Sequence, residues 1–428
     1  MKKFIYPHRV FAFKYDSLTG LYNKKTFYKK VKKQIVEDSS RIYYLIYSNI
    51  DDFKFINDMF GYKKGDEILK NTATLLKTIG QGNNISARIN SDRFAVLVED
   101  FFFGEEKLFE ISSTLKKLYR RDGIQVNIHF GIYKIENGES NVNVIAGCSK
   151  RILKTIKGNS IKVFAYYDEF FKNFEKNERD VITNFDSALE NQEFKIFLQP
   201  QISFDGKLKG AEVLARWVTK ENKIISPDKF IGPLERTGLI SKLDENIWCQ
   251  AAKLLKQWER TEKQDLNLSI NLSVKDFENL DIYETITNLV KKYDIPPQKL
   301  RLEITESAFM SDAEKTLEII HKFRKAGFYV EIDDFGKGYS SLSLLKDIEV
   351  DMLKIDMDFL KKTKDEIKSI IILESIITLT KNLGIDVITE GVETKAQVDS
   401  LNQLGCSLFQ GYYFSKPISV PEFEKKYS

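Results

Sequence analysis

The sequence predicts two different domains in succession, an α+β sandwich and then a TIM-type (β/α)8 barrel, so that the fold class is mixed α/β and α+β. In residues 1–165, strand-like runs joined by a short turn are mixed with amphipathic helices, which is typical of an antiparallel sheet covered by helices. In residues 193–428, about eight strand-like runs alternate with helical stretches, which is the proportion of a barrel. A helix over residues 166–192, charged and with aromatics at helical spacing, is expected to join the two.

The composition is that of an ordinary globular protein with no single-sign charge field. Of the 428 residues, 42% are apolar and 30% are charged, and 66 basic against 62 acidic residues leave a net charge of +4. No general attraction to nucleic acid or to anionic lipid is therefore expected. Cys148, Cys249 and Cys406 lie far apart in sequence, which argues against a disulfide framework or a thiolate zinc site and fits a reducing cytoplasm.

The N-terminal residues are basic, but their apolar run is interrupted by Pro7, His8, Arg9 and Lys14. We therefore expect neither a signal peptide nor an anchor there. No window approaches the roughly 18 apolar residues of a membrane span. A cytoplasmic protein without a membrane segment is the expectation.

The first domain is expected to place helices against one central sheet. Turn residues at Asn90, Ser91 and Asp92 divide residues 85–100 into two strands. Further strands are predicted at 42–51, 124–135 and 161–166, and helices at 23–37, 63–79, 105–120 and 142–158.

Three motifs in this half resemble the GGDEF domain, the diguanylate cyclase fold, which is a nucleotide-cyclase-like sandwich. They are DSLTGLYNKKTF (16–27), NIDDFKFINDMFGYKKGDEIL (49–69) and ARINSDRFAVL (87–97). The signature Gly-Gly-Asp/Glu-Glu-Phe reads Asn-Ser-Asp-Arg-Phe at residues 90–94, so that two glycines carry side chains and Arg93 replaces an acid. Asn49 replaces the first metal-binding aspartate of the family. Cyclase activity is therefore expected to be lost.

Other positions of the first domain bear on nucleotide binding. By the resemblance, Asn57 and Asp66 match residues that hydrogen-bond guanine, so this domain is expected to bind GTP as a regulator. The alternative is that both residues cap local helices. The family's inhibitory product site falls on Gln81 and Asn84 and is expected to be absent. His129 is expected to be a packed residue rather than a metal ligand.

In the second domain, polar and mostly acidic side chains follow the predicted strands at their carboxyl ends, where barrel enzymes place their active sites. Each acid alone fits a helix cap or a surface charge. Together they would repel one another strongly without cations, and all-oxygen ligation selects Mg²⁺ or Mn²⁺. These side chains are Glu212, Asn271, Glu303, Glu306, Asp333, Asp334, Lys354, Asp356, Glu390, Glu393 and Gln410.

The same residues belong to motifs that resemble the EAL domain, the cyclic di-GMP phosphodiesterase family, across essentially the whole second half. The motifs are EVLARW (212–217), NLS (271–273), EITES (303–307), DDFGKGYSSL (333–342), LKID (353–356), TEGVE (389–393) and QGYYFSKP (410–417). The resemblance implies a two-metal enzyme that hydrolyses cyclic di-GMP to linear pGpG.

The resemblance also implies roles for single residues. Glu212, Asn271, Glu303, Asp333, Asp334 and Glu390 would hold the two metal ions, with Asp333 as the bridge. Glu390 would bind or deprotonate the attacking water, and Lys354 would orient that water and offset charge on the phosphorane. Gln199, Arg216, Asp356 and Gln410 are expected around the substrate, although Arg216 fits the anchoring of a neighbouring loop equally well. Glu306 would brace the glycine loop after the aspartates.

Two positions depart from the family pattern. Val213 replaces an alanine beside Glu212, and Lys337 stands in the glycine loop where threonine is usual. A lysine there would repel a nearby ion or pair with an acid. The alternative to an enzyme is therefore a receptor that binds cyclic di-GMP without turnover. A homodimer through the barrel is expected from the resemblance alone.

Overall fold

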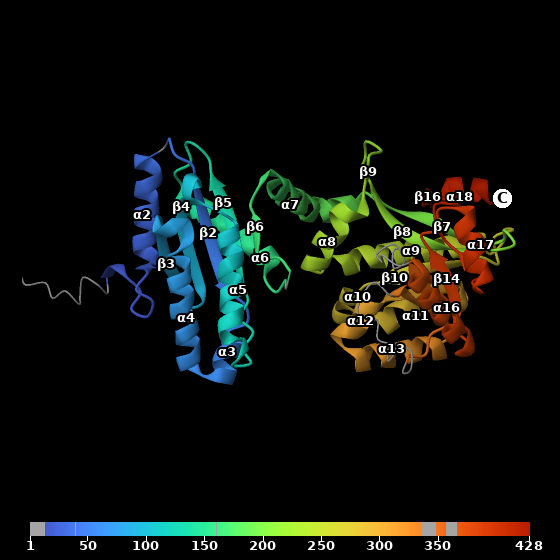
Figure 1. Ribbon diagram of the computed structural model, residues 1–428. Helices are drawn as coiled ribbons and strands as arrows, with labels where there is room; N and C mark the ends of the chain where they lie inside the picture. The colour runs from blue at the N-terminus through green and yellow to red at the C-terminus, as the bar shows by residue number, and fades with distance from the viewer. Residues whose placement is uncertain (1–12, 39, 160, 336–347, 357–365) are drawn as a thin grey trace, which may run out of the picture. The chain divides into compact units, whose positions relative to one another are not determined.

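The computed structural model describes residues 13–38, 40–159, 161–335, 348–356 and 366–428. The chain divides into two compact units, Met1–Lys176 and Asn177–Ser428, and Figure 1 shows the elements of each. The division falls inside helix α7 (Glu169–Glu190), which lies within residues 166–192, where a connecting helix was predicted. Each unit is described by itself below.

The first unit is built on a six-stranded sheet in the order β1-β3-β4-β2-β5-β6. The pairs β3–β4, β4–β2 and β2–β5 are antiparallel, as predicted, whereas β1–β3 and β5–β6 are parallel. The strands are β1 (Tyr22–Asn23), β2 (Tyr43–Ile50), β3 (Asn84–Asn90), β4 (Arg93–Glu99), β5 (Ile128–Ile135) and β6 (Phe164–Tyr166).

Helices cover both faces of this sheet. One core cluster joins the sheet to α3 (Phe53–Phe60), α4 (Tyr62–Leu76) and α5 (Glu106–Arg120). A second core cluster joins the other face to α2 (Lys24–Glu37) and α6 (Val142–Ile156). The short helix α3 was not predicted. Gly61 lies between it and α4 and separates the two helices. Two 3₁₀ turns, η1 (Ile79–Gly82) and η2 (Asp100–Phe102), complete the unit.

The second unit is an eight-stranded barrel, and all eight predicted strands are present. The strand order is β7-β8-β10-β11-β12-β13-β14-β15, and pairing of β15 with β7 closes the barrel. The strands are β7 (Phe194–Ser203), β8 (Leu208–Val218), β10 (Asn267–Leu272), β11 (Leu300–Thr305), β12 (Val330–Phe335), β13 (Met352–Asp356), β14 (Asp386–Glu390) and β15 (Leu408–Phe409), with the short outer strands β9 (Ile224–Ile225) and β16 (Ile418–Ser419).

One strand departs from the regular parallel pattern. β7 runs antiparallel to both of its neighbours, β8 and β15, whereas the other barrel strands are parallel to one another. The physical reason is the connection: only residues 204–207 join β7 to β8, and a parallel crossover needs a dozen residues or more.

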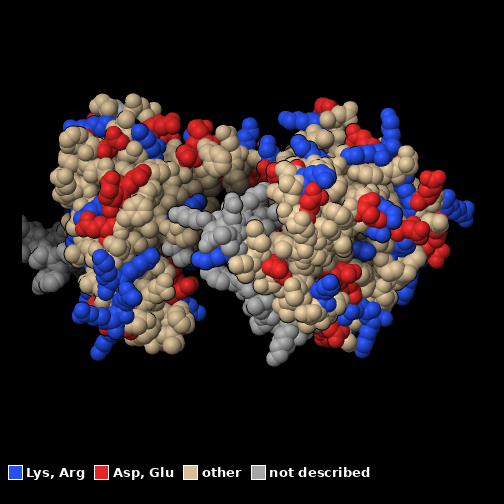
Figure 2. All heavy atoms as spheres, turned by 45° about the vertical axis from the view of Figure 1, so that its right-hand side comes forward, with Lys and Arg blue, Asp and Glu red and all other residues tan. Residues whose placement is uncertain are grey.

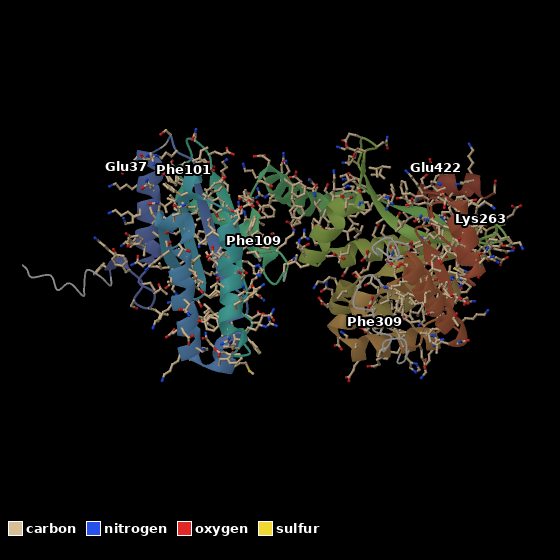
Figure 3. All side chains as sticks on the ribbon, in the orientation of Figure 1. Glu37, Phe101, Phe109, Lys263, Phe309 and Glu422 are labelled. Carbon is tan, nitrogen blue, oxygen red and sulfur yellow. The ribbon has the colours of Figure 1, made fainter. Side chains whose placement is uncertain are left out.

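Helices surround the barrel and bury its outer face. They are α8 (Pro227–Thr237), α9 (Ile240–Trp258), α10 (Val274–Asn279), α11 (Ile282–Tyr293), α12 (Glu306–Ser311), α13 (Ala313–Lys325), α16 (Glu366–Asn382), α17 (Lys395–Gln403) and α18 (Val420–Lys426), with the 3₁₀ turn η3 (Pro297–Lys299). Figure 3 marks Phe309 of α12, which is buried, whereas Phe101 and Phe109 of the first unit are exposed.

The surface carries charges of both signs. Figure 2 shows Lys and Arg interspersed with Asp and Glu on the visible face of each unit, as the small net charge predicts. None of the helices in the described ranges is long and apolar enough to cross a bilayer.

Candidate active site in the barrel

Most of the predicted site residues lie on adjacent barrel strands. They are Glu212 on β8, Asn271 on β10, Glu303 on β11, Asp333 on β12, Lys354 and Asp356 on β13, and Glu390 on β14. Parallel register pairs Asn271 with Glu303, and Asp356 with Glu390. Because side chains at positions i and i+2 of a strand share a face, the acids of neighbouring strands meet at one end of the barrel.

The acids meet around one amine, that of Lys354 on β13. Its Nζ lies 2.8 Å from Glu303 Oε2, 2.8 Å from Glu390 Oε1, and 3.4 Å from both Glu212 Oε2 and Asp333 Oδ1. The side chain of Lys354 is fully buried, and those of the four acids are between 0% and 16% exposed. When all five groups are ionised, one positive charge faces four negative charges, so the site attracts further cations.

Amide side chains hold Glu212 from the sides. Gln410, after β15, donates a hydrogen bond from Nε2 to Glu212 Oε2 and another, 3.4 Å long, to Gln199 Oε1. Asn271 Nδ2 donates to Glu212 Oε1 at 3.3 Å. Trp248 of α9 donates from its indole to the Asn271 carbonyl at 3.0 Å and thereby fixes the end of β10. Trp248 was not predicted as a residue that supports the site, because its position in the sequence does not distinguish it from a tryptophan of the hydrophobic core.

Burial and like charges perturb the titration of this cluster. Burial favours the neutral amine of Lys354, but Asp333, Glu212 and the two other acids outweigh it and hold the pKa of Lys354 well above its usual range. Burial raises the pKa of Glu390 to about 8, with Lys354 opposing and Asp333 adding to the rise. Such a carboxyl is suited to exchange a proton near neutral pH.

The described residues do not form a ready-made metal cage. Within the described ranges, no three His, Cys, Asp or Glu side chains are arranged closely enough to hold a metal ion. The donor set nevertheless fits a hard cation, because it consists of carboxylate and amide oxygens. In the described part of the chain, Glu303 Oε1 is buried and has no hydrogen-bond donor, whereas Glu303 Oε2 and Glu390 Oε1 face the Lys354 ammonium at 2.8 Å.

Other predicted residues lie around this cluster or outside the described parts. Arg216 is half-buried, donates to the neighbouring Ala215 carbonyl at 2.8 Å and lies over the Phe197 ring. Burial lowers the pKa of its guanidinium. Glu306 begins α12 and is buried. The Asp334 side chain and Lys337, with the loop that Glu306 was expected to brace, lie outside the described residues.

In the first unit, Asn57 and Asp66 lie on the neighbouring helices α3 and α4. The Oδ1 atom of Asn57 lies over Gly65, 2.0 Å from the point that a Cβ would occupy, and Asp66 is exposed. Neither is an N-cap, because α3 starts after Asp52 and α4 after Gly61. The alternative of local helix caps is therefore wrong.

The altered signature turn makes its own contacts. Asn49 of β2 donates a hydrogen bond to the Asp92 carboxylate in the turn between β3 and β4. His129 of β5 is buried and bonds to Asp51 at 2.7 Å and to the Lys162 carbonyl at 2.8 Å, so it is a packed residue, as predicted.

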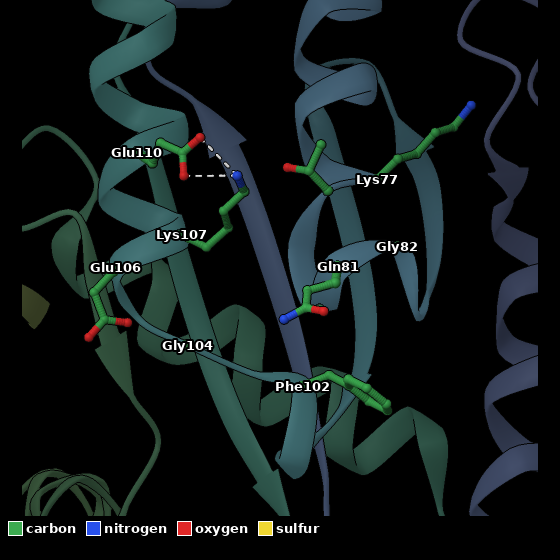
Figure 4. A pocket seen from close by; sticks show the side chains of 10 residues that line it. Lys77, Gln81, Gly82, Phe102, Gly104, Glu106, Lys107 and Glu110 are labelled. Atoms are coloured by element: carbon green, nitrogen blue, oxygen red, sulfur yellow. Dashed lines mark hydrogen bonds and ion pairs between the residues drawn. The ribbon is translucent and has the colours of Figure 1, made fainter.

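Gln81 lies beside a cavity of about 600 Å³ (Figure 4). Gln81 lines the cavity together with Lys107, whose Nζ is paired with Glu110 at 2.8 Å. Asn84 is turned to the backbone, where its amide donates to the Ile79 carbonyl at 2.6 Å.

Two family models match the chain. The model of the EAL domain matches residues 183–417, and that of the diguanylate cyclase, GGDEF domain, matches residues 13–160. The chain belongs to the tandem GGDEF–EAL proteins. Both resemblances drawn from the sequence are thereby confirmed.

Curated relatives match this GGDEF–EAL chain over nearly its whole length. The signaling protein YkoW of Bacillus subtilis is 31% identical over 96% of this chain and 52% of its own length. The bifunctional diguanylate cyclase/cyclic di-GMP phosphodiesterase MucR of Pseudomonas aeruginosa is 27% identical over 95% of this chain and 61% of its own length. The cyclic di-GMP phosphodiesterase PdeR of Escherichia coli is 27% identical over 96% and 63%. The chain thus spans between about half and two thirds of these relatives.

Solved structures agree on the fold. The PaMucR phosphodiesterase in complex with c-di-GMP has 31% identity and a TM-score of 0.54, and covers 57% of this chain and 99% of its own. The Vibrio cholerae LapD S helix-GGDEF-EAL structure, bound to c-di-GMP, covers 95% of this chain and 98% of its own with a TM-score of 0.61. Its 20% identity supports the fold alone.

Proposed function

We propose that this chain is a metal-dependent phosphodiesterase that hydrolyses cyclic di-GMP to linear pGpG. The observation that carries the proposal is the convergence of Glu212, Glu303, Asp333 and Glu390 on buried Lys354 at one end of the barrel. Relatives named as cyclic di-GMP phosphodiesterases support the choice of substrate.

Two Mg²⁺ or Mn²⁺ ions would be held by Glu212, Asn271, Glu303, Asp333, Asp334 and Glu390, and would supply water activation and polarisation of the phosphodiester. The ions fit because Glu303 Oε1 is a buried carboxylate oxygen without a hydrogen-bond donor in the described part of the chain. That oxygen-only donor set is the reason to expect hard cations.

The chain's own residues then account for proton and charge movement. Glu390, with a pKa of about 8, takes the proton of the attacking water. The water oxygen bonds to phosphorus, the bond from phosphorus to the 3′ oxygen breaks, and that oxygen takes up a proton from solvent, while Glu390 releases its proton to solvent. The ammonium of Lys354 stabilises the negative charge that develops on the phosphoryl oxygens. Gln199, Arg216, Asp356 and Gln410 would contact the nucleotide.

The test is incubation of the purified chain with cyclic di-GMP and Mg²⁺ or Mn²⁺, with pGpG followed by chromatography. Glu212→Ala is expected to reduce pGpG formation to background. The matched control is Glu318→Ala, at an exposed position of α13, which leaves the rate unchanged. An inactive parent chain that still binds cyclic di-GMP would contradict the enzyme.

The second candidate function is a receptor that binds cyclic di-GMP without hydrolysis. One observation favours it: within the described residues, the acids surround Lys354 and no three acids form a metal cage. Mn²⁺ binding by calorimetry separates the two functions, because the enzyme requires metal uptake.

For the first unit, we propose a regulatory domain that binds GTP and does not cyclise it. The hydrogen bond from Asn49 to Asp92 and the cation at Arg93 support the loss of cyclase chemistry. Asn84, which donates to backbone carbonyls, supports the loss of the inhibitory site. GTP is expected to speed pGpG formation in the parent chain and to have no effect in Asn57→Ala.

We further propose that the barrel self-associates into a homodimer. On α16, Ile370, Ile371 and Ile372 are 52%, 54% and 42% exposed, which is an unusual apolar run for a free surface. Light scattering after gel filtration is expected to give twice the chain mass, and Ile371→Glu is expected to give the single-chain mass.

A further inference from the structure

A second ion pair lies inside the barrel, beneath the acids of the site. Arg301 and Glu331 stand two residues before Glu303 on β11 and Asp333 on β12, respectively, so each shares the inner face with a site residue. Strand register pairs Glu303 directly with Glu331. Adjacent strands are about 4.8 Å apart, so these two carboxylate side chains are neighbours.

Glu331 is as deeply buried as the site itself. It is 0% exposed, and Arg301 Nη1 lies 3.1 Å from its Oε1. Within the described residues, its Oε2 is buried and accepts no hydrogen bond. Glu331 stands two residues before the site acid Asp333 and pairs with Arg301, so any role in the reaction acts through its neighbour Glu303.

Contacts at the base of the barrel fix the position of Arg301. Its guanidinium lies 4.3 Å from the centre of the Tyr329 ring. The Tyr329 hydroxyl donates at 2.6 Å to Asp386, the first residue of β14. Tyr329 therefore fixes the position of the Arg301 guanidinium, and the ion pair with Arg301 fixes Glu331 beside Glu303.

Two carboxylates directly opposite in a sheet repel each other. Glu303 Oε2 pairs with Lys354 Nζ at 2.8 Å, and the equally buried Glu331 is the direct neighbour of Glu303 on β12. A divalent cation at Glu303 relieves this repulsion, since it compensates more than one negative charge. The negative charge of Glu331 therefore favours occupation of the site by a cation.

We propose that Glu331, anchored by Arg301, is a positioning residue that raises the affinity of the barrel site for divalent metal through its neighbour Glu303. The inference rests on the proposed phosphodiesterase function. It assigns Glu331 an electrostatic role in the layer of the barrel that lies two residues before Glu303 and Asp333 on their strands. Residues behind metal ligands typically change metal affinity by about 10-fold to 100-fold when mutated.

The experiment measures Mn²⁺ binding to the full chain by calorimetry, together with the Mn²⁺ dependence of pGpG formation. Glu331→Gln is expected to weaken Mn²⁺ binding by about 10-fold or more, with a smaller loss of kcat at saturating Mn²⁺. Glu331→Asp keeps the charge and is expected to bind Mn²⁺ nearly as the parent does. Glu318→Gln is the surface control and is expected to match the parent.

Glu331→Gln leaves Arg301 buried without its partner and can impair folding. The double variant Arg301→Gln with Glu331→Gln removes both charges, and its expected Mn²⁺ affinity lies between those of the parent and Glu331→Gln. Parent-like Mn²⁺ affinity in the folded single and double variants overturns the inference alone. A parent chain that binds no Mn²⁺ overturns the proposed function, and this inference with it.

Discussion

Lys354 Nζ lies 2.8 Å from Glu390 Oε1 in the barrel site. Lys354 is fully buried, and it is the only cation that the described residues place within 4.0 Å of the four site acids. Among the described residues, Glu303 and Glu390 therefore depend on Lys354 whenever no metal ion is bound. This dependence leads to the first two predictions.

Lys354→Met is expected to abolish hydrolysis and to make the metal-free chain unstable. Removal of one partner from a buried ion pair costs about 3–5 kcal/mol, because the other charge stays buried without compensation. The rate of pGpG formation is expected to fall about 1000-fold, as for the loss of a residue that stabilises transition-state charge. Thermal unfolding with and without Mn²⁺ checks the first effect, and Mn²⁺ is expected to stabilise the variant more than the parent.

The matched control is Lys322→Met, which removes a lysine from an exposed pair with Glu318 on α13. This variant is expected to keep both the unfolding temperature and the rate. Equal unfolding temperatures for Lys354→Met and the parent in the absence of metal would show that the buried acids do not depend on this cation.

The second prediction concerns pH and the metal-free chain. Burial raises the pKa of Glu390 from 4.5 to about 8 in the folded state, so the folded state holds this proton more tightly than the unfolded state does. The resulting stability is fully present below pH 4.5 and is lost as the pH rises through about 8. Unfolding in denaturant between these pH values, with metal removed by a chelator, is expected to show falling stability as pH rises.

Glu390→Gln cannot ionise and is expected to lose less stability over the same range. A parallel decline in the parent and in Glu390→Gln would assign the pH dependence to other groups. The variant is also expected to be inactive, because it cannot take a proton from water.

The barrel and most of its site residues could be predicted from sequence because the polar residues recur at the ends of alternating apolar strands. The direction of β7 could not, since antiparallel pairing depends on the four-residue connection to β8 and on closure with β15. The common contact of four acids with Lys354 also depends on closure, because register across separate strands sets the distances.

The pairing of Arg301 with Glu331 was not predicted, although the sequence contains a pattern that indicates both residues. In LRLEITES and FYVEIDDF, a charged residue stands two positions before Glu303 and before Asp333, at Arg301 and Glu331. Alternation places both on the inner face. Only the structure shows that they pair with each other, because the pairing depends on the register between β11 and β12.

The third prediction concerns a buried carboxyl pair away from the site. Asp276 of α10 is fully buried and accepts hydrogen bonds from Ser273 Nα and Oγ at 2.7 and 2.8 Å. Burial, followed by the charge of Asp276, raises the pKa of Asp244 on α9 well above its usual range. Stability from this pair is therefore present at low pH and is lost as the pH rises through the raised pKa of the folded state.

Asp244→Asn removes one of the two charges and is expected to stabilise the chain at pH 8 by about 1 kcal/mol or more. At pH 4 the variant and the parent are expected to be equally stable. Denaturant unfolding at both pH values makes the comparison, and Asp265→Asn, at an exposed position before β10, is the control. A gain of the same size at pH 4 would exclude charge repulsion as the cause.

The fourth prediction tests the guanine-binding assignment of the first unit through Gly65. A Cβ at this position would lie 2.0 Å from Asn57 Oδ1, so Gly65→Ala must displace the Asn57 side chain. Because a side-chain amide recognises a base edge only when it is correctly placed, the GTP affinity measured by calorimetry is expected to fall about 10-fold, a loss of about 1.4 kcal/mol.

The control is Gly147→Ala in α6, where a Cβ would meet only the Arg151 guanidinium at 3.4 Å. Alanine favours a helix, so this control is expected to stabilise the chain by up to about 1 kcal/mol without a change in GTP affinity. Unchanged GTP binding in Gly65→Ala would mean that Asn57 does not contact the nucleotide.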